Sequence, residues 1–250
     1  MDATNFVTAC ASSAQAYKTA TLLKTLNVNA IIGGEVGVGK KTLAKYILND
    51  APLIDGSNYN EVLTALGNSK EIIITNFENI PNIKKVLELI KENSVRLIAT
   101  AKSSFYNEYI DDIFSVKFDI PPLSQRPEDV KELKKIYMQE ASKLFNISTK
   151  LSIKNFKPDL SQNSNSLKRQ IMISSLLQDI NESELIDILE NYIKGKLGSN
   201  SDYRNLLYLY EVPLIRAGLN KYKSQLQLSN KLGLNRNTLR KKIADNSEYL

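Results

Sequence analysis

A glycine-rich stretch near the amino terminus has the spacing of a phosphate-binding loop. Residues 34–41 read GEVGVGKK, which fits the pattern G-x-x-x-x-G-K-[ST] except that Lys41 stands at the last position. Glycines let a backbone curl until several N–H groups face one anion, and a helix that follows adds its positive amino-terminal end. Lys40 could then reach the terminal phosphates of a nucleotide. The residues expected to contact it are Gly34, Glu35, Gly37, Gly39, Lys40, Lys41 and Thr42.

A second candidate site lies near the carboxyl terminus, where positive charge is concentrated. From residue 221 to the end there are seven Lys or Arg against two Asp or Glu, which is five of the chain's net charge of +6. Helices are predicted at 225–232 and 236–244, with Gly233 suited to the left-handed turn that ends the first and Asn235 suited to cap the second. This arrangement is typical of a helix-turn-helix, whose second helix enters the major groove of DNA. The residues expected to contact DNA are Gln225, Asn235, Arg236, Asn237, Thr238, Arg240 and Lys241. A basic amphipathic helix that packs on another protein is the alternative.

The elements around the glycine loop alternate between apolar runs and amphipathic segments. Strands are predicted at 28–32, 52–54, 71–75, 96–100 and 115–120, and helices at 9–26, 42–48, 58–66 and 83–91. Strands that alternate with helices form a parallel sheet covered on both faces. The sequence therefore predicts an α/β domain over residues 1–120, with the glycine loop directly after its first strand.

The pattern changes at Pro121 and Pro122, after which only helices are predicted. They span 126–145, 167–177 and 183–196, and they would form a helical subdomain over residues 121–197. Residues 197–201 have the composition of a linker. A further helix, 202–219, would open the helix-turn-helix domain over residues 202–250.

Composition excludes several classes of function. The 250 residues contain one cysteine and no histidine, which rules out a disulfide framework and both Ser-His and Cys-His catalysis and argues against zinc. No metal is expected beyond magnesium carried by a nucleotide. There is no basic leader followed by a long apolar run and no apolar run near 18 residues, so a cytoplasmic protein without membrane contact is expected.

Three stretches together resemble a known family. The sequences GEVGVGKKTLA at 34–44, PPLSQRPEDV at 121–130 and GLNRNTLRKKI at 233–243 are similar, in this order, to those of bacterial enhancer-binding proteins. These are AAA+ activators of sigma-54 RNA polymerase that end in a Fis-type helix-turn-helix. The resemblance implies an AAA+-like P-loop sheet domain, an all-α lid and a Fis-type DNA-binding domain. Its implied ligands are ATP or ADP and double-stranded DNA, and its implied protein partners are RNA polymerase, sigma-54 or a paralogous activator.

The same resemblance implies a homodimer. A Fis-type unit normally works as a dimer, and the helix 202–219 would pair with its symmetry mate. The side chains expected at that interface are Leu206, Leu209, Tyr210 and Leu214.

The chain departs from this family at the positions that carry its catalysis. Thr75 and Asn76 stand where the family has an Asp-Glu pair, and Tyr106 and Asp112 align with its two arginine fingers. The 22 residues from 49 to 70 leave no room for the sigma-contacting loop with its GAFTGA signature. Without acids there is no strong magnesium anchor and no base to orient water.

These departures favour a regulator that does not hydrolyse ATP. We expect a DNA-binding transcriptional regulator whose AAA+-like module serves nucleotide sensing, oligomerisation or partner binding. Two alternatives stay open: a diverged ATP-dependent activator of sigma-54 polymerase, and an interaction protein that modulates a true paralogous activator. ATP turnover is therefore undecided by the sequence, with its absence favoured.

Overall fold

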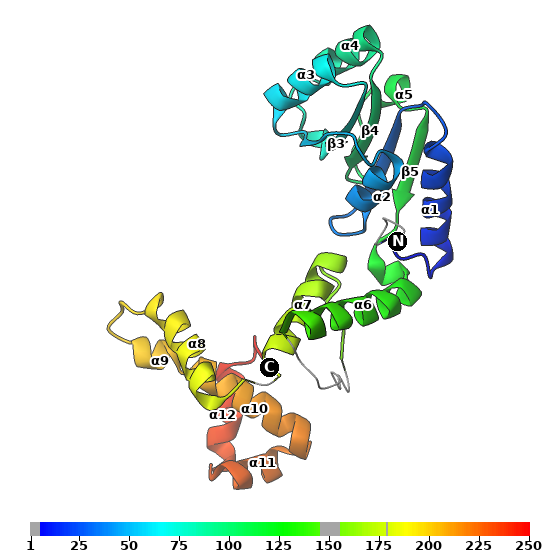
Figure 1. Cartoon of the computed structure of the whole chain (residues 1–250). Helices are drawn as coiled ribbons and strands as arrows, with labels where there is room; N and C mark the ends of the chain where they lie inside the picture. Colours follow the sequence, from blue (N-terminus) through cyan, green and yellow to red (C-terminus); the bar gives the residue numbers. More distant parts are fainter. Residues whose placement is uncertain (1–5, 146–155, 179) are drawn as a thin grey trace. The chain divides into compact units, whose positions relative to one another are not determined.

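The structure is a computed structural model that describes residues 6–145, 156–178 and 180–250 (Figure 1). It divides into two compact units, Met1–Asp179 and Ile180–Leu250. The helix predicted near 183–196 lies in the second of these units, together with the predicted DNA-binding residues. The predicted division into three domains remains a prediction, and each unit is described by itself.

A five-stranded parallel sheet forms the centre of the first unit. Its strands are β1 (Ala30–Gly34), β2 (Leu53–Asp55), β3 (Glu71–Thr75), β4 (Arg96–Ala101) and β5 (Val116–Ile120). They lie in the order β2-β3-β4-β1-β5, and every neighbouring pair is parallel. The predicted α/β fold is therefore confirmed, and each predicted strand matches an observed one to within a few residues. Because β1 lies inside the sheet with neighbours on both sides, the loop that follows it opens at the middle of the sheet's carboxyl edge.

Helices cover both faces of this sheet. They are α1 (Ala11–Leu23), α2 (Lys40–Ile47), α3 (Tyr59–Asn68), α4 (Ile83–Asn93) and the short α5 (Ile110–Ile113). Ile73 packs in one apolar cluster with α1 and α2, whereas its neighbours Ile72 and Ile74 pack in the other with α3, α4 and α5. Successive strand residues point to opposite faces, so a continuous apolar run such as 72–74 is what a sheet buried on both sides requires.

Two long helices, α6 (Pro127–Phe145) and α7 (Ser164–Leu176), form the lid that follows the sheet. They pack on one another through a separate apolar cluster. Its buried members are Leu123, Leu133, Ala141, Leu167 and Ile171. The lid belongs to the same compact unit as the sheet, so its contacts with the glycine loop are part of one packed structure.

The second unit is entirely helical in the part that the structure describes. Its helices are α8 (Glu182–Lys194), α9 (Asp202–Leu206), α10 (Tyr208–Tyr222), α11 (Gln225–Leu232) and α12 (Arg236–Asp245). A small core of Ile215, Leu228 and Leu239 joins the last three. At Gly218 an added Cβ would lie 2.2 Å from Leu228 Cδ1, so glycine is what allows α10 and α11 to approach.

Two sequence expectations for this unit are corrected. The single helix predicted over 202–219 is interrupted at Leu207, although the backbone there keeps helical angles of φ −60° and ψ −28°. The predicted linker 197–201 is instead an ordered turn, because the Asp202 carboxylate accepts hydrogen bonds from the Gly198 and Ser199 amides at 2.9 and 3.0 Å. A turn held by side-chain hydrogen bonds has the same polar composition as a linker, so the sequence does not distinguish the two.

None of the helices in the described part of the chain is long and apolar enough to cross a membrane.

Candidate functional site

The glycine loop leaves β1 at the sheet's carboxyl edge and leads directly into α2. Gly37 and Gly39 have φ angles of 79° and 106°, in the region that side chains with a Cβ rarely adopt. An added Cβ at Gly37 would lie 2.3 Å from the Gln162 carbonyl oxygen, and one at Gly39 would lie 2.7 Å from the Phe6 ring. The glycines are therefore required by the curl of the loop and by the close approach of the lid at Gly37 and of the amino-terminal segment at Gly39.

Lys40, the first residue of α2, turns its ammonium group back onto the loop. Its Nζ donates to the carbonyl oxygens of Gly34 at 2.5 Å and Glu35 at 2.8 Å. Burial lowers the pKa of Lys40 from its usual value, while the nearby charge of Glu78 acts in the opposite direction. The ammonium group thus occupies a pocket of carbonyl dipoles beside the place where an anion would bind.

A cavity of about 360 Å³ opens over this loop on its phosphate-binding side. Its size is at the lower end of small-molecule sites. It is lined by Glu35, Val36, Gly37, Gly39, Lys40, Lys41, Thr42, Asp55, Thr75, Asn76, Thr100, Ser164 and Asn165. Six of the seven residues predicted to contact a nucleotide therefore line one cavity, and the seventh, Gly34, supplies a carbonyl to Lys40.

Asp55 brings a carboxylate into this cavity from the end of β2. Its Oδ1 accepts from the Ser57 amide at 2.9 Å, and its Oδ2 accepts from Asn76 Nδ2 at 2.6 Å. The hydrogen bond from the Ser57 backbone holds the pKa of Asp55 below its usual value. Parallel pairing sets Asp55 opposite Thr75, which is why residues 20 apart in the sequence meet here.

The lid is tied to the loop by Asn163, at the start of α7. Its Nδ2 donates to Glu35 Oε2 and to the Val36 carbonyl oxygen, both at 2.9 Å, and its Oδ1 accepts from the Leu123 amide at 2.6 Å. The residue is 1% exposed and has a φ of 53°. Ser164 adds a hydrogen bond from Oγ to the Gly37 carbonyl oxygen at 2.6 Å.

A buried ion pair supports the loop from the other side. Arg126 Nη1 lies 3.2 Å from Asp129 Oδ2, and Arg126 Nη2 donates to the Val38 carbonyl oxygen at 3.1 Å. Asp129 Oδ1 also accepts from the Cys10 amide at 2.9 Å. The side chains of Arg126 and Asp129 are 3% and 0% exposed, so this pair fixes the amino-terminal segment, the loop and the lid together.

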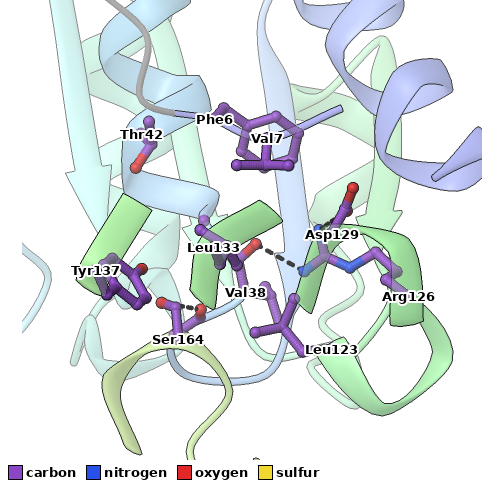
Figure 2. Close-up of a pocket in the computed structure, with 12 residues that line it drawn as sticks. Phe6, Val7, Val38, Thr42, Leu123, Arg126, Asp129, Leu133, Tyr137 and Ser164 are labelled. Carbon is purple, nitrogen blue, oxygen red and sulfur yellow. Dashed lines mark hydrogen bonds and ion pairs between the residues drawn. The ribbon is translucent and has the colours of Figure 1, made fainter. Parts of the chain in front are cut away.

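A small cavity with a mixed polar and apolar lining adjoins the loop between the amino-terminal segment and the lid. Figure 2 shows Phe6 and Val7 on one side of it and Leu123 on the other, with Tyr137 at its edge. Its volume is about 70 Å³, below the few hundred Å³ of a typical ligand pocket. In the described arrangement the phosphate side of the site is open, and this side is nearly filled by side chains.

The residues predicted to contact DNA lie at the start of α11 and at the amino-terminal end of α12 in the second unit. Gly233 has the left-handed φ of 63° that ends α11, and Asn235 caps α12 by accepting from the Asn237 amide at 2.9 Å. Leu239, on the opposite side of α12, is fully buried. All seven predicted residues are exposed, namely Gln225, Asn235, Arg236, Asn237, Thr238, Arg240 and Lys241.

Comparisons with known proteins give a fold but no sequence relative. The sequence matches no protein-family profile and no curated protein. Among solved structures, NtrX from Brucella abortus in complex with ATP superposes with a TM-score of 0.58 at 15% identity, covering 98% of this chain and 69% of that one. The same protein in complex with ADP gives a TM-score of 0.57 at 15% identity, covering 96% and 69%. A DNA replication initiation factor gives 0.51 at 13% identity, covering 88% and 72%.

The parallel sheet of this chain, with a glycine loop after β1, has the fold of these solved structures. Of the positions that aligned with family catalytic residues, Thr75 and Asn76 line the cavity over the glycine loop, whereas Tyr106 and Asp112 are not among its lining residues. Tyr106 is 86% exposed, Asp112 is also exposed, and the Thr75 hydroxyl donates to the Ile54 carbonyl oxygen at 3.3 Å. In the lid, Lys168 pairs with Glu140 at 2.6 Å on the surface.

Three residues of this site were not predicted as site residues from the sequence: Asp55, Arg126 and Asn163. Each acts through contacts made far along the chain, by strand register for Asp55 and by lid packing for the other two. Arg126 and Asp129 could have been suspected as a pair from their helical spacing of three. Nothing in the sequence around Asn163 distinguishes it from the other polar residues of its loop.

Proposed function

We propose that this chain is a DNA-binding transcriptional regulator whose AAA+-like module binds ATP or ADP and senses nucleotide without working as a motor. The observation that carries the proposal is the exposed face of α12, where a capped helix amino terminus presents Arg236, Asn237 and Arg240 above a buried Leu239. Guanidinium and amide groups pair with base edges, and lysines suit phosphates. The side chains of Arg236, Asn237 and Arg240 are all exposed in the structure.

Support for nucleotide binding comes from the loop and its cavity. Three loop glycines have positive φ, Lys40 lies at the loop's end, and a cavity of about 360 Å³ opens over both. The structural likeness to NtrX in complex with ATP or ADP agrees with this ligand class.

Support for the absence of a motor comes from the neutral end of β3 and from the region before it. Thr75 and Asn76 supply no carboxylate, and between the end of α2 and the start of β3 the structure has only β2 and α3. Among the described residues 48–70, which join α2 to β3, there is no further helix or strand. A diverged sigma-54 activator would need both functions from other residues.

DNA binding is tested by selecting duplexes from a random pool with the full chain and measuring affinity for the enriched site. At fixed salt, Arg236→Ala and Arg240→Ala should each weaken specific binding by about 10- to 100-fold, which corresponds to about 1–3 kcal/mol per base contact. Lys18→Ala, an exposed change on α1, is the matched control. Unchanged specific affinity in both α12 variants would refute the proposal.

The nucleotide part is tested by titration with a fluorescent ATP analogue and by phosphate release. Lys40→Ala should abolish binding, and the wild-type chain should release no phosphate above background. Turnover that disappears in Lys40→Ala would instead support the diverged activator. Binding of a paralogous activator, with no enriched DNA site, would support the interaction protein.

A homodimer through the second unit is part of the proposal. In the single chain Leu206, Leu209 and Leu214 stay half-buried and Tyr210 is 66% exposed, so these side chains are free to contribute to an interface. Two half-sites about 34 Å apart, one helical turn of DNA, are expected in the enriched duplexes.

A further inference from the structure

A carboxylate that lines the cavity over the glycine loop lies at the end of β2, whereas the family resemblance places an acid after β3. The β3 strand ends at Thr75, and Asn76 follows, so neither residue is charged. Among the described residues that line the cavity, the acids are Glu35 and Asp55. Glu35 Oε2 accepts from Asn163 of the lid at 2.9 Å. Asp55 is therefore the acid that faces the cavity from the sheet.

We infer that Asp55 takes the place of the missing third-strand acid and holds the magnesium ion that accompanies a nucleotide bound in this cavity. The inference rests on the proposed nucleotide binding. It adds to that proposal a ligand residue and a metal dependence.

Strand pairing explains how one strand can substitute for the other. The register sets Ile54 opposite Ile74 and Asp55 opposite Thr75, so the two strand ends lie side by side at the carboxyl edge. The hydrogen bond of 2.6 Å from Asn76 Nδ2 to Asp55 Oδ2 shows that the two side chains are in direct contact at this edge. One member of this pair is a carboxylate and the other an amide, with the acid on β2.

The donor set fits a hard divalent cation. Magnesium prefers oxygen ligands and is usually held by one or two carboxylates together with phosphates and water. Asp55 supplies the carboxylate, and the hydroxyl-bearing residues Thr42, Thr75 and Thr100 line the same cavity. Asp55 accepts hydrogen bonds from the amide and the hydroxyl of Ser57 and from Asn76 Nδ2, and its two oxygens together offer about four lone-pair sites, which leaves room for a cation.

Another acid lies nearby but does not compete for this role. Glu78 influences the pKa of Lys40 and forms an ion pair with Lys102 at 4.0 Å, and it is not among the residues that line the cavity. Glu78 therefore provides a control variant, because it is an acid of the same region that does not line the cavity.

The experiment measures the affinity of the full chain for a fluorescent ATP analogue, first in EDTA and then with magnesium. Wild type should bind in EDTA and bind more tightly with magnesium. Asp55→Asn should keep its affinity in EDTA and lose most of the magnesium enhancement, a change of about 10- to 100-fold, as is typical when a metal site loses a supporting group. Binding of manganese with ADP, followed by electron paramagnetic resonance, reads the metal directly.

Three further variants sharpen the result. Asp50→Asn removes an exposed acid outside the cavity and should leave the magnesium enhancement unchanged. Glu78→Gln should also leave it unchanged. The exchange Asp55→Asn with Asn76→Asp returns the carboxylate to the end of the third strand, and it should restore a large part of the enhancement because the two side chains are in direct contact at this edge.

The outcomes separate this inference from the proposal beneath it. If wild type binds no nucleotide in EDTA or magnesium, the proposed nucleotide binding fails and the inference fails with it. If wild type binds but magnesium has no effect, or if Asp55→Asn keeps the full enhancement, only the inference is overturned. Loss of the enhancement in Glu78→Gln and not in Asp55→Asn would overturn it as well.

Discussion

The guanidinium group of Arg126 donates to the carbonyl oxygen of Val38 at 3.1 Å, joining two residues 88 positions apart in the chain. Arg126 opens the lid helix α6 and Val38 lies inside the glycine loop, so the hydrogen bond connects the lid to the phosphate-binding backbone (Figure 2). The same arginine pairs with Asp129, which accepts from the Cys10 amide. The shape of the loop therefore depends on a buried charge pair outside it.

Removing one charge of this pair should be costly. Asp129→Asn leaves Arg126 buried and unpaired, and it is expected to lower the free energy of unfolding by about 3 kcal/mol, measured by urea denaturation. Glu132→Gln, which breaks the exposed pair with Lys135, is the control and should cost less than about 1 kcal/mol. Equal effects of the two changes would show that the buried pair is unimportant. Arg126→Met with Asp129→Leu should recover part of the loss.

Asn163 should contribute both hydrogen bonds and backbone freedom. Asn163→Ala removes three buried hydrogen bonds and places a Cβ residue at a φ of 53°, whereas Asn163→Gly removes the same bonds without that strain. Both variants should unfold at lower urea concentrations than wild type, and the alanine variant should be less stable by about 1 kcal/mol. Exposed Asn60→Ala is the control. If glycine is the more damaging change, the backbone account is wrong.

Gly37→Ala should loosen the lid. The new Cβ would meet the Gln162 carbonyl oxygen at 2.3 Å and adopt a φ of 79°, so the lid loop must shift. We expect a loss of about 1–3 kcal/mol in stability and faster hydrogen exchange at the amides of Leu123 and Ser164, whose acceptors lie at this junction.

Gly67→Ala is the matched control for this change. It lies within α3, and an added Cβ there meets nothing within 4 Å. It should stabilise the chain by about 0.5–1 kcal/mol, because alanine favours helix more than glycine does. If Gly37→Ala behaves like Gly67→Ala, the close approach of the lid is refuted.

Salt dependence should distinguish two classes of residue on α12. Lys241→Ala is expected to weaken binding to all duplexes alike and to reduce the slope of log affinity against log salt by about 1, since it removes one phosphate contact. Arg236→Ala should instead relax the preference for the enriched duplex over a scrambled one. Affinities measured at several salt concentrations on both duplexes provide the test, and identical behaviour of the two variants would contradict it.

Much of the fold could be predicted because its signals are local. The run 72–74 announces a strand buried on both faces, and Gly233 with Asn235 announces a turn between two helices, which the structure confirms. Such features depend on residues within a few positions of one another. The predicted helix over 202–219 failed only at Leu207, where a change in hydrogen bonding without a change in backbone angles leaves no mark in the sequence.

The candidate site was predictable only in part. The loop residues were found because glycine spacing is itself the geometry of the loop. Asp55 could not be found in this way, because its position depends on the register between β2 and β3. Asn163 reaches Glu35 across 128 residues, and such a contact follows from the packing of the lid and not from any local pattern.

The contacts of Lys40 have a consequence for how the chain would respond to its ligand. An incoming phosphate would meet an ammonium group that already donates to two carbonyl oxygens, those of Gly34 and Glu35, so one of its three N–H donors remains. The carbonyl oxygens of the loop therefore compete with a phosphate for the Lys40 ammonium group in every molecule. If tight binding requires Lys40 to leave these carbonyl oxygens, the measured Kd equals the intrinsic Kd divided by the fraction of molecules in which the lysine is released. The nucleotide concentration that half-saturates the chain would then depend on these backbone contacts. A partner that donated a hydrogen bond to either carbonyl oxygen in place of Lys40 would lower that concentration without touching the nucleotide.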